Sequence, residues 1–309
     1  MKHVFLSLLL FFSCVSAVFS QSKLFDLGRI NFSISPKILD NGSITDISLG
    51  YGYTDTLYGV LRFRNTLSSM NEELLDVADS LNAVNEKTYE VFLLPVEYYF
   101  FKTENIRSWI GGGLYYQYST LDEKGFFNMP SLETMTPPRE RVNSYTNSFR
   151  MHLLGPLVEA GILYNSPWVN VSFSGGISPV FLLSSSQKMS IDPLISGFAE
   201  YSQDTGGSPY MYFSLDSVIM KYVNLVLLYD FARLDYKTVD FDASLNWINP
   251  ERTVTTQSFK IEASVLLPLG DMRAQIGYGW TFDSTLIEGG SSVNGNRQYV
   301  ILAAKKSGN

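Results

Sequence analysis

The chain has two histidines, and the one beyond the N-terminal segment is His152. Ser148 lies four residues before it, so the pair has the residue types of a nucleophile and a general base. The spacing matches no catalytic motif, however, and a lone histidine beside Arg150 in a strand-like segment is more typical of a structural polar residue. A single histidine also excludes a metal site built from histidines. We therefore expect a non-enzyme without a metal or cofactor.

A set of charged residues points instead to the passage or binding of charged solutes. Each stands at a polar position of a segment in which polar and apolar residues alternate. The set is Arg29, Asp46, Arg62, Arg64, Glu97, Glu159, Asp216, Asp230, Lys260, Glu262 and Arg273. If these side chains line one interior, they either pair across strands and fill it, or form opposed acidic and basic walls that set ion selectivity. Both alternatives stay open.

Two ion pairs follow from the strand positions of these charges. Counted from the nearest short turns, Arg62 and Glu97 come to nearly the same height on neighbouring antiparallel segments. Arg64, one inward position higher, can reach Asp46 on the preceding segment. Opposed or diagonal residues of paired strands lie within reach of such side chains. The sequence therefore predicts the pairs Arg62–Glu97 and Arg64–Asp46.

The elements that hold these residues are short segments with a two-residue alternation, which predicts β-strands. About twelve such segments occur. They are 28–36, 44–54, 57–65, 88–101, 107–120, 147–164, 167–183, 208–219, 221–235, 255–269, 271–284 and 297–305. The 19 Tyr, 21 Phe and 23 Gly of the 309 residues also favour an all-β fold.

The connections between these segments alternate in length. Short ones lie at 54–56, 102–106, 165–167, 220 and 270, and long polar ones at 66–87, 121–146, 184–207 and 236–254. Short turns at one end and long loops at the other are typical of a barrel in the bacterial outer membrane. We predict an all-β, antiparallel transmembrane barrel of about twelve strands, with ten or fourteen as alternatives.

The two faces of the strands separate a membrane barrel from a soluble one. In 168–178 the apolar face holds Val and Phe, and the opposite face holds Asn, Ser and Gly rather than the Lys and Glu of a solvated face. The apolar faces carry Tyr53, Tyr98, Trp168 and Trp280 near the strand ends, as in aromatic girdles. We expect apolar side chains to face lipid and polar ones to face the lumen.

One long connection has a helical pattern. Apolar residues recur every three or four positions between Leu67 and Val84, and Ser69 and Glu72 match a capping box. The sequence predicts a helix of three to four turns here, which either caps the barrel or folds in to narrow the lumen.

The N-terminus predicts export. Lys2, an apolar run from Val4 to about Phe12, and small residues up to Ser20 form a signal peptide, so we expect domains 1–20 and 21–309. Cleavage after Ala17 is the alternative, and Cys14 follows a poor lipobox. Without Lys2, 22 Lys and Arg stand against 30 Asp and Glu, a net charge of −8 that argues against nucleic acid as a partner.

Two adjoining motifs resemble a known family. The segment Phe92–Phe100, FLLPVEYYF, and the segment Trp109–Tyr116, WIGGGLYY, look like paired strands of the porin-like outer-membrane β-barrel superfamily. The resemblance covers about two strands. It implies location in the bacterial outer membrane, insertion by the barrel-assembly machinery, and passive passage of small solutes. Many members end on an aromatic residue, whereas this chain ends in Ala304–Asn309.

Two functions from different classes follow. The leading expectation is a narrow channel for the passive diffusion of small polar solutes, since twelve strands fall between filled eight-stranded barrels and open porins. The alternative is an adhesin or another interaction protein that displays its long loops, including Phe126, Phe127 and Trp247, to a host or matrix ligand.

Overall fold

The computed structural model is β-strand over almost the whole of its described part, in which no helix combines the length and apolar character needed to span a membrane. The described residues are 30–39, 42–73, 81–129, 141–192, 195–201, 208–237, 240–241, 247–248, 251–269, 272–287 and 292–306. Arg29 and the expected signal peptide lie outside these ranges.

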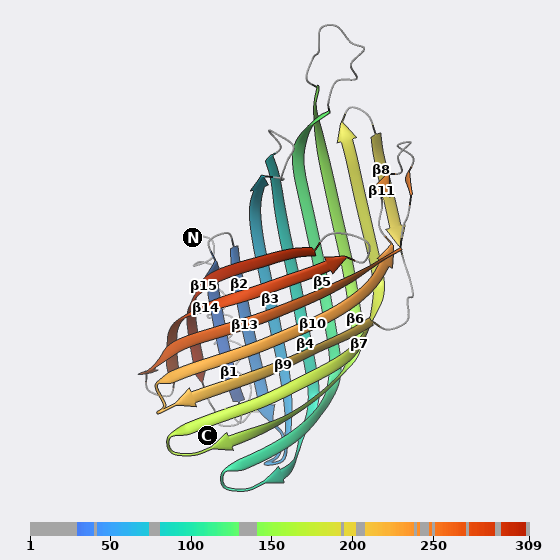
Figure 1. Ribbon diagram of the computed structural model, residues 1–309. Coiled ribbons are helices and arrows are strands. Elements are labelled where there is room, and N and C mark those ends of the chain that lie inside the picture. The colour runs from blue at the N-terminus through green and yellow to red at the C-terminus, as the bar shows by residue number, and fades with distance from the viewer. Residues whose placement is uncertain are drawn as a thin grey trace, which may run out of the picture.

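Twelve strands close into one antiparallel barrel, as the alternation predicts (Figure 1). Their bounds are β1 Ile30–Leu39, β2 Gly42–Gly52, β3 Leu57–Glu73, β4 Leu81–Lys102, β5 Ile106–Met129, β6 Arg141–Asn165, β7 Val169–Asp192, β9 Ser208–Ile219, β10 Val223–Lys237, β13 Glu251–Leu269, β14 Met272–Ile287 and β15 Ser292–Lys306. Each strand pairs with the next in this order, and β1 closes the ring by pairing with β15.

Three further strands lie outside the ring. β8 (Ile195–Tyr201) pairs with the far part of β7, Ser185–Ile191, whereas β9 pairs with the near part, Val169–Val180. β8 therefore continues the sheet beyond the end of β9. β11 (Asp240–Phe241) and β12 (Trp247–Ile248) form a separate two-stranded ladder.

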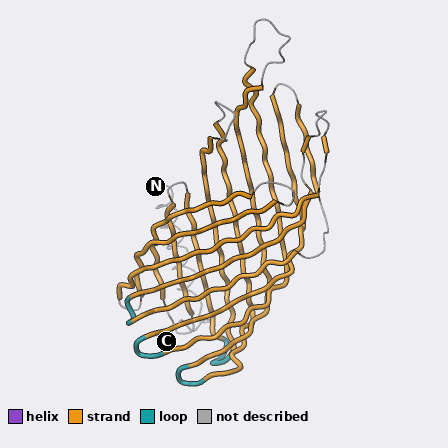
Figure 2. The backbone as a smooth tube through the Cα atoms, viewed as in Figure 1, coloured by secondary structure: helices purple, strands orange, loops and turns teal. Residues whose placement is uncertain are grey.

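Four of the five expected short turns are confirmed, at 53–56, 103–105, 166–168 and 220–222, and the fifth, at 270–271, lies outside the described residues. All four close one end of the barrel, which we call the short-turn end (Figure 2). Met220 and Lys221 have φ values of 50° and 67°, the left-handed backbone that a tight hairpin turn needs.

The opposite end is uneven, because β3 to β7 have 17 to 25 residues whereas β1 and β2 have 10 and 11. About 9–11 residues of a tilted strand cross a bilayer. The longer strands rise above the rest of the rim as one tall wall (Figures 1 and 2). Much of the sequence assigned to long loops at 66–87, 121–146 and 184–207 is thus strand.

The expected helix between Leu67 and Val84 is wrong for its described parts. Residues up to Glu73 belong to β3 and residues from Leu81 belong to β4, and Met70 is the register partner of Val84. The segment 74–80 lies outside the described residues. Because β3 and β4 are already paired below, extending their ladder costs less than starting a helix, whose first turn is unfavourable. Ladder formation therefore overrides the helical spacing.

The two faces of the barrel strands separate as expected. On β14, Ile276, Trp280 and Phe282 are 51%, 36% and 45% exposed, whereas Gln275 and Thr281, at positions of the opposite face, are buried. The interior also holds an apolar and aromatic cluster, which the alternation did not predict. Its buried members are Phe92, Leu94, Tyr115, Met151, Leu153, Leu157, Val180, Tyr210 and Tyr212.

Candidate functional site

The centre of the site is Arg64, which projects inward from β3 and contacts three carboxylates. Its Nε donates to Oδ1 of Asp46 at 2.8 Å, and Nη1 lies 3.5 Å from Oε2 of Glu90 and 3.7 Å from Oδ2 of Asp230. β10, which carries Asp230, is separated from β3 by five strands in either direction around the ring. The Arg64–Asp230 bridge therefore crosses the full width of the lumen.

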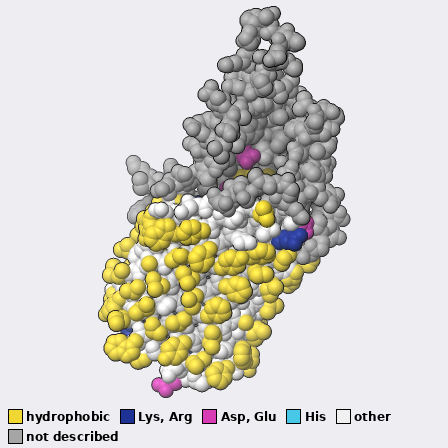
Figure 3. Space-filling model, in the orientation of Figure 1, with side chains coloured by type: hydrophobic (Ala, Val, Ile, Leu, Met, Phe, Trp, Pro, Cys, Tyr) yellow, Lys and Arg dark blue, Asp and Glu magenta, His cyan; other side chains and the backbone are white. Residues whose placement is uncertain are grey.

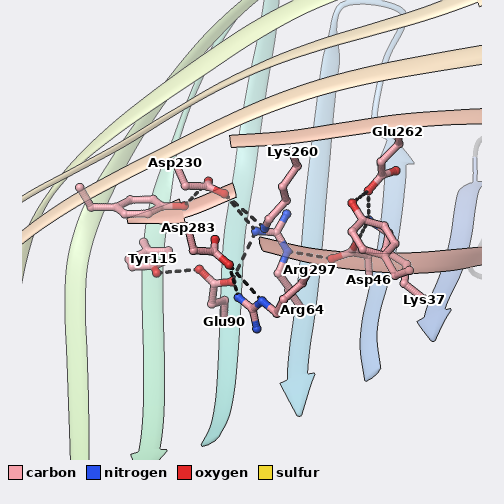
Figure 4. A network of polar contacts seen from close by, with 12 residues as sticks. Lys37, Asp46, Arg64, Glu90, Tyr115, Asp230, Lys260, Glu262, Asp283 and Arg297 are labelled. Carbon is pink, nitrogen blue, oxygen red and sulfur yellow. Dashed lines mark hydrogen bonds and ion pairs between the residues drawn. The ribbon is translucent and has the colours of Figure 1, made fainter. Parts of the chain in front are cut away.

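Further contacts extend this bridge into one network (Figure 4). Nζ of Lys260 lies 3.4 Å from Oδ2 of Asp230, and the hydroxyl of Tyr210 donates to the same carboxylate at 3.3 Å. The hydroxyl of Tyr115 donates to Glu90 at 2.9 Å, and its ring stacks on that of Tyr210 with centroids 4.4 Å apart. Side chains from β3, β4, β5, β9, β10 and β13 thus meet at one level.

The network continues on the other side through Lys37 of β1. Its Nζ lies 2.7 Å from Oδ2 of Asp46 and 2.5 Å from Oε1 of Glu262, and the hydroxyl of Tyr299 donates to Glu262 at 2.8 Å. Lys37 and Glu262 are both buried. Every carboxylate of this layer therefore has a cation or hydroxyl against it, which is the condition for charges to be buried at tolerable cost.

A second layer lies nearer the short-turn end, two residues down β3. Nη2 of Arg62 pairs with Oε2 of Glu159, which also accepts from the hydroxyl of Tyr212. The guanidinium carbon of Arg62 is 5.8 Å from the ring centroid of Tyr212. Gly176 makes room for that ring, because a Cβ on it would come 2.4 Å from Cε1 of Tyr212.

Glu97 stands next to this layer and is 6% exposed. A Cβ on Gly111 would come 3.1 Å from its Cγ, so the Glu97 side chain lies over Gly111. Gly111 is the register partner of both Glu97 and Glu159. Two carboxylates and one arginine thus share this part of the lumen.

The predicted pair Arg64–Asp46 is confirmed, but the pair Arg62–Glu97 is wrong. Arg62 faces Phe92 in the register, and Glu97 faces Tyr58. Neighbouring strands of a closed barrel are staggered, so equal distances from the short turns do not give equal heights. A bulge between Tyr58 and Val60 shifts the register by one more residue.

Two of the remaining predicted residues, Asp216 and Arg273, lie nearer the short-turn end. Asp216 is on the face of β9 that also carries the buried Tyr210 and Tyr212. Arg273 is exposed and lines a pocket among the short turns together with Glu104 and Lys221. Arg29 lies outside the described residues.

Several network residues were missed by the sequence prediction, each for a definable reason. Lys37 follows Pro36, where the predicted strand ended, although Ser33, Ser35 and Lys37 continue the alternation. Glu90 and Glu97 are an odd number of residues apart, so a regular strand would place them on opposite faces. The irregular pairing between Leu93 and Val96 lets both side chains point inward. Other members missed are Tyr115, Tyr210, Tyr212, Tyr299, Asp283 and Arg297.

His152 does not belong to this interior. It alternates with the buried Met151 and Leu153, its Nδ1 shares a hydrogen bond of 2.8 Å with the hydroxyl of Tyr116, and its ring stacks on Tyr118. Ser148 instead donates to Asp122 at 2.6 Å. In the described strands, no three His, Cys, Asp or Glu residues come together to hold a metal ion.

The outer surface shows where the molecule resides. Apolar side chains form a broad band over the strands near the short-turn end, with few charges among them (Figure 3). Tyr53, Tyr98, Trp168 and Trp280 lie on this outer face with exposures of 36% to 72%. An apolar exterior around a closed barrel with a charged interior is the inverse of a soluble protein and fits a bilayer. The protein is an outer-membrane β-barrel.

Three solved structures with a similar fold are distant in sequence from this outer-membrane barrel. The translocator domain of the autotransporter NalP from Neisseria meningitidis has 11% identity and a TM-score of 0.46, covering 98% of this chain and 96% of that one. The Pseudomonas putida toluene transporter TodX has 7% identity and a TM-score of 0.46, covering 90% and 89%. The Escherichia coli outer membrane protease OmpT has 12% identity and a TM-score of 0.31, covering 90% and 93%. No protein-family model matches the chain, and no curated protein sequence does either.

Proposed function

We propose that this barrel is a gated channel for small polar solutes, closed in the present conformation by the Arg64–Asp230 bridge. The bridge carries the proposal, because it joins opposite walls of the lumen. A cavity of about 440 Å³, here called the vestibule, lies on one side of it and is lined by Arg64, Glu90, Asp230 and Lys260 among others. A second pocket, of about 350 Å³, lies among the short turns beside Lys221 and Arg273.

The bridge can separate without leaving either charge unpaired. Arg64 retains Asp46 and Glu90 as partners, and Asp230 retains Lys260. Removing one partner from a buried ion pair costs about 3–5 kcal/mol when nothing replaces it. Because replacements are in place on both sides, opening here avoids that penalty. This redundancy favours a gate over a permanent plug.

The proposal is tested by single-channel recording of the full chain in planar bilayers with potassium chloride. We expect discrete but brief openings for the wild type, and a larger fraction of time open for Asp230→Asn, which weakens the bridge. Asp235→Asn is the matched control, because Asp235 is an exposed residue of the same strand. No conducting steps in either the wild type or Asp230→Asn would overturn the proposal.

One observation favours the alternative interaction function. β3 to β7 continue well past the length that crosses a bilayer, so they present a tall sheet outside the membrane. An adhesin would use that sheet and leave the lumen closed. Persistent absence of conductance in the bridge variant, together with correct folding, would favour this function.

A further inference from the structure

The vestibule carries charges of both signs in close alternation. Arg64, Lys260 and Arg297 line it together with Glu86, Glu90, Asp230 and Asp283. Arg297 is bound to Asp283 at 2.5 Å, and Arg64 and Lys260 are held by the contacts given above. Its volume of about 440 Å³ lies within the range of about 300–1,000 Å³ that is typical of small-ligand sites.

This lining discriminates between classes of solute. A simple anion near Arg64 also meets the carboxylates of Glu90 and Asp230, and a simple cation near Asp230 meets Arg64 and Lys260. A solute that carries a carboxylate and an ammonium group close together can pair with the basic and the acidic side chains at the same time. Charged hydrogen bonds of this kind are the stronger ones, and a guanidinium can hold a carboxylate through two of them.

We propose that the vestibule binds small zwitterions of the α-amino-acid type, and that their binding opens the Arg64–Asp230 bridge. The inference rests on the proposed channel function for its gating part only. The solute carboxylate takes the place of Asp230 on Arg64, and its ammonium group takes the place of Arg64 on Asp230. The bridge is then replaced by two separate ion pairs.

The exchange gives the ligand the differential affinity that gating requires. A ligand shifts a conformational equilibrium only if it binds one state better than the other. While the bridge is intact, Arg64 and Asp230 occupy each other, and a zwitterion gains full access to both only when they part. Lys260 and Glu90 remain within reach on either side, so the separated state keeps its charges balanced.

Binding and gating are tested separately on the full chain, with glycine as the probe. Isothermal titration calorimetry in detergent micelles measures binding directly. Planar-bilayer recording measures the fraction of time open in potassium chloride, with glycine, acetate or methylammonium added at equal concentration. Acetate and methylammonium each carry one half of the glycine charge pair. We expect saturable glycine binding, and an increase in open time that acetate and methylammonium do not reproduce.

Arg64→Gln should weaken glycine binding by about tenfold or more, because a charged hydrogen-bonding partner is lost. Arg64→Lys keeps the positive charge but lacks the planar guanidinium group, so it should bind glycine with intermediate strength. This second variant keeps the site testable if Arg64→Gln fails to fold. Arg150→Gln, an exposed arginine on β6, should bind like the wild type.

The outcomes separate the two proposals. Equal responses to glycine, acetate and methylammonium, or no heat of glycine binding, would overturn the zwitterion site even if the channel conducts. Glycine binding that needs Arg64, without any conducting steps, would support the site and overturn the channel function.

Discussion

Lys37 and Glu262 lie 225 positions apart in the sequence, yet their charged groups meet at 2.5 Å inside the barrel. β14 and β15 separate the strands that carry them, and Asp46 holds Lys37 from the other side at 2.7 Å. This contact joins the N-terminal strands to the C-terminal ones next to the seam where β1 meets β15. It therefore links the ion-pair network to closure of the barrel.

Lys37→Met should destabilise the folded barrel by about 3–5 kcal/mol, because it leaves Glu262 buried without its cation. The free energy of unfolding by urea in detergent micelles measures the change. Lys188→Met, at an exposed position on β7, is the control and should change stability by less than about 0.5 kcal/mol. The double variant Lys37→Met/Glu262→Gln should recover part of the loss, and no recovery would show that the charge is not the cause.

Gly279→Ala should also destabilise the barrel, by about 1–3 kcal/mol. A Cβ at Gly279 would lie 2.4 Å from Cε2 of Tyr299, and this ring is buried and tied to Glu262 by its hydroxyl. Gly112→Ala is the matched control, because nothing lies within 4 Å of a Cβ there. Equal unfolding free energies for the two variants would contradict this packing argument.

Labelling should show which end of the barrel faces outward. Asp55 and Lys124 are exposed at opposite ends, Asp55 in a short turn and Lys124 high on β5. With single cysteines at these positions in a Cys14→Ser background, a bulky maleimide that cannot cross membranes should label Lys124→Cys on intact cells. It should label Asp55→Cys only after the outer membrane is permeabilised. The reverse pattern would invert the orientation.

The sequence predicts the barrel well because its determinants are local. Alternation of apolar and polar residues sets the faces of each strand, and short polar breaks such as Thr54–Thr56 set the turns. These signals gave twelve strands and the pairing of Arg64 with Asp46. The strand ends beyond the membrane were less predictable from the sequence. β3 and β4 extend there because each added residue pair continues an existing ladder of hydrogen bonds, and not because of any local preference.

The candidate site was predicted only in part, because it depends on register and on contacts across the lumen. Pro95 and its neighbours interrupt the alternation on β4. Glu90 and Glu97 therefore both point inward, although they are an odd number of residues apart. The partner of Arg62 is set by stagger around the ring, which no single strand encodes. Arg64 and Asp230 meet only because five strands on each side bring β3 and β10 face to face.

Glu97 and Glu159 are both buried carboxylates of the same part of the lumen, yet they should respond differently to loss of their charge. Glu159 accepts from Arg62 and Tyr212, whereas Glu97 lies over Gly111 and forms no ion pair with any residue that the structure describes. Glu159→Gln removes the counter-charge of Arg62, so we expect a loss of about 3–5 kcal/mol in unfolding free energy. Glu97→Gln removes one of two negative charges but leaves the Arg62–Glu159 pair intact. Its unfolding free energy should therefore change much less than that of Glu159→Gln.

The same substitution should nevertheless change ion selectivity. With Glu97 neutral, Arg62 and Glu159 balance each other, and this stretch of the lumen loses its net negative charge. The reversal potential in a potassium chloride gradient at pH 8 should therefore shift toward chloride for Glu97→Gln. Glu123→Gln, a carboxylate high on β5, is the control and should keep the wild-type reversal potential. A Glu97→Gln channel with unchanged selectivity would show that this layer lies off the conducting path.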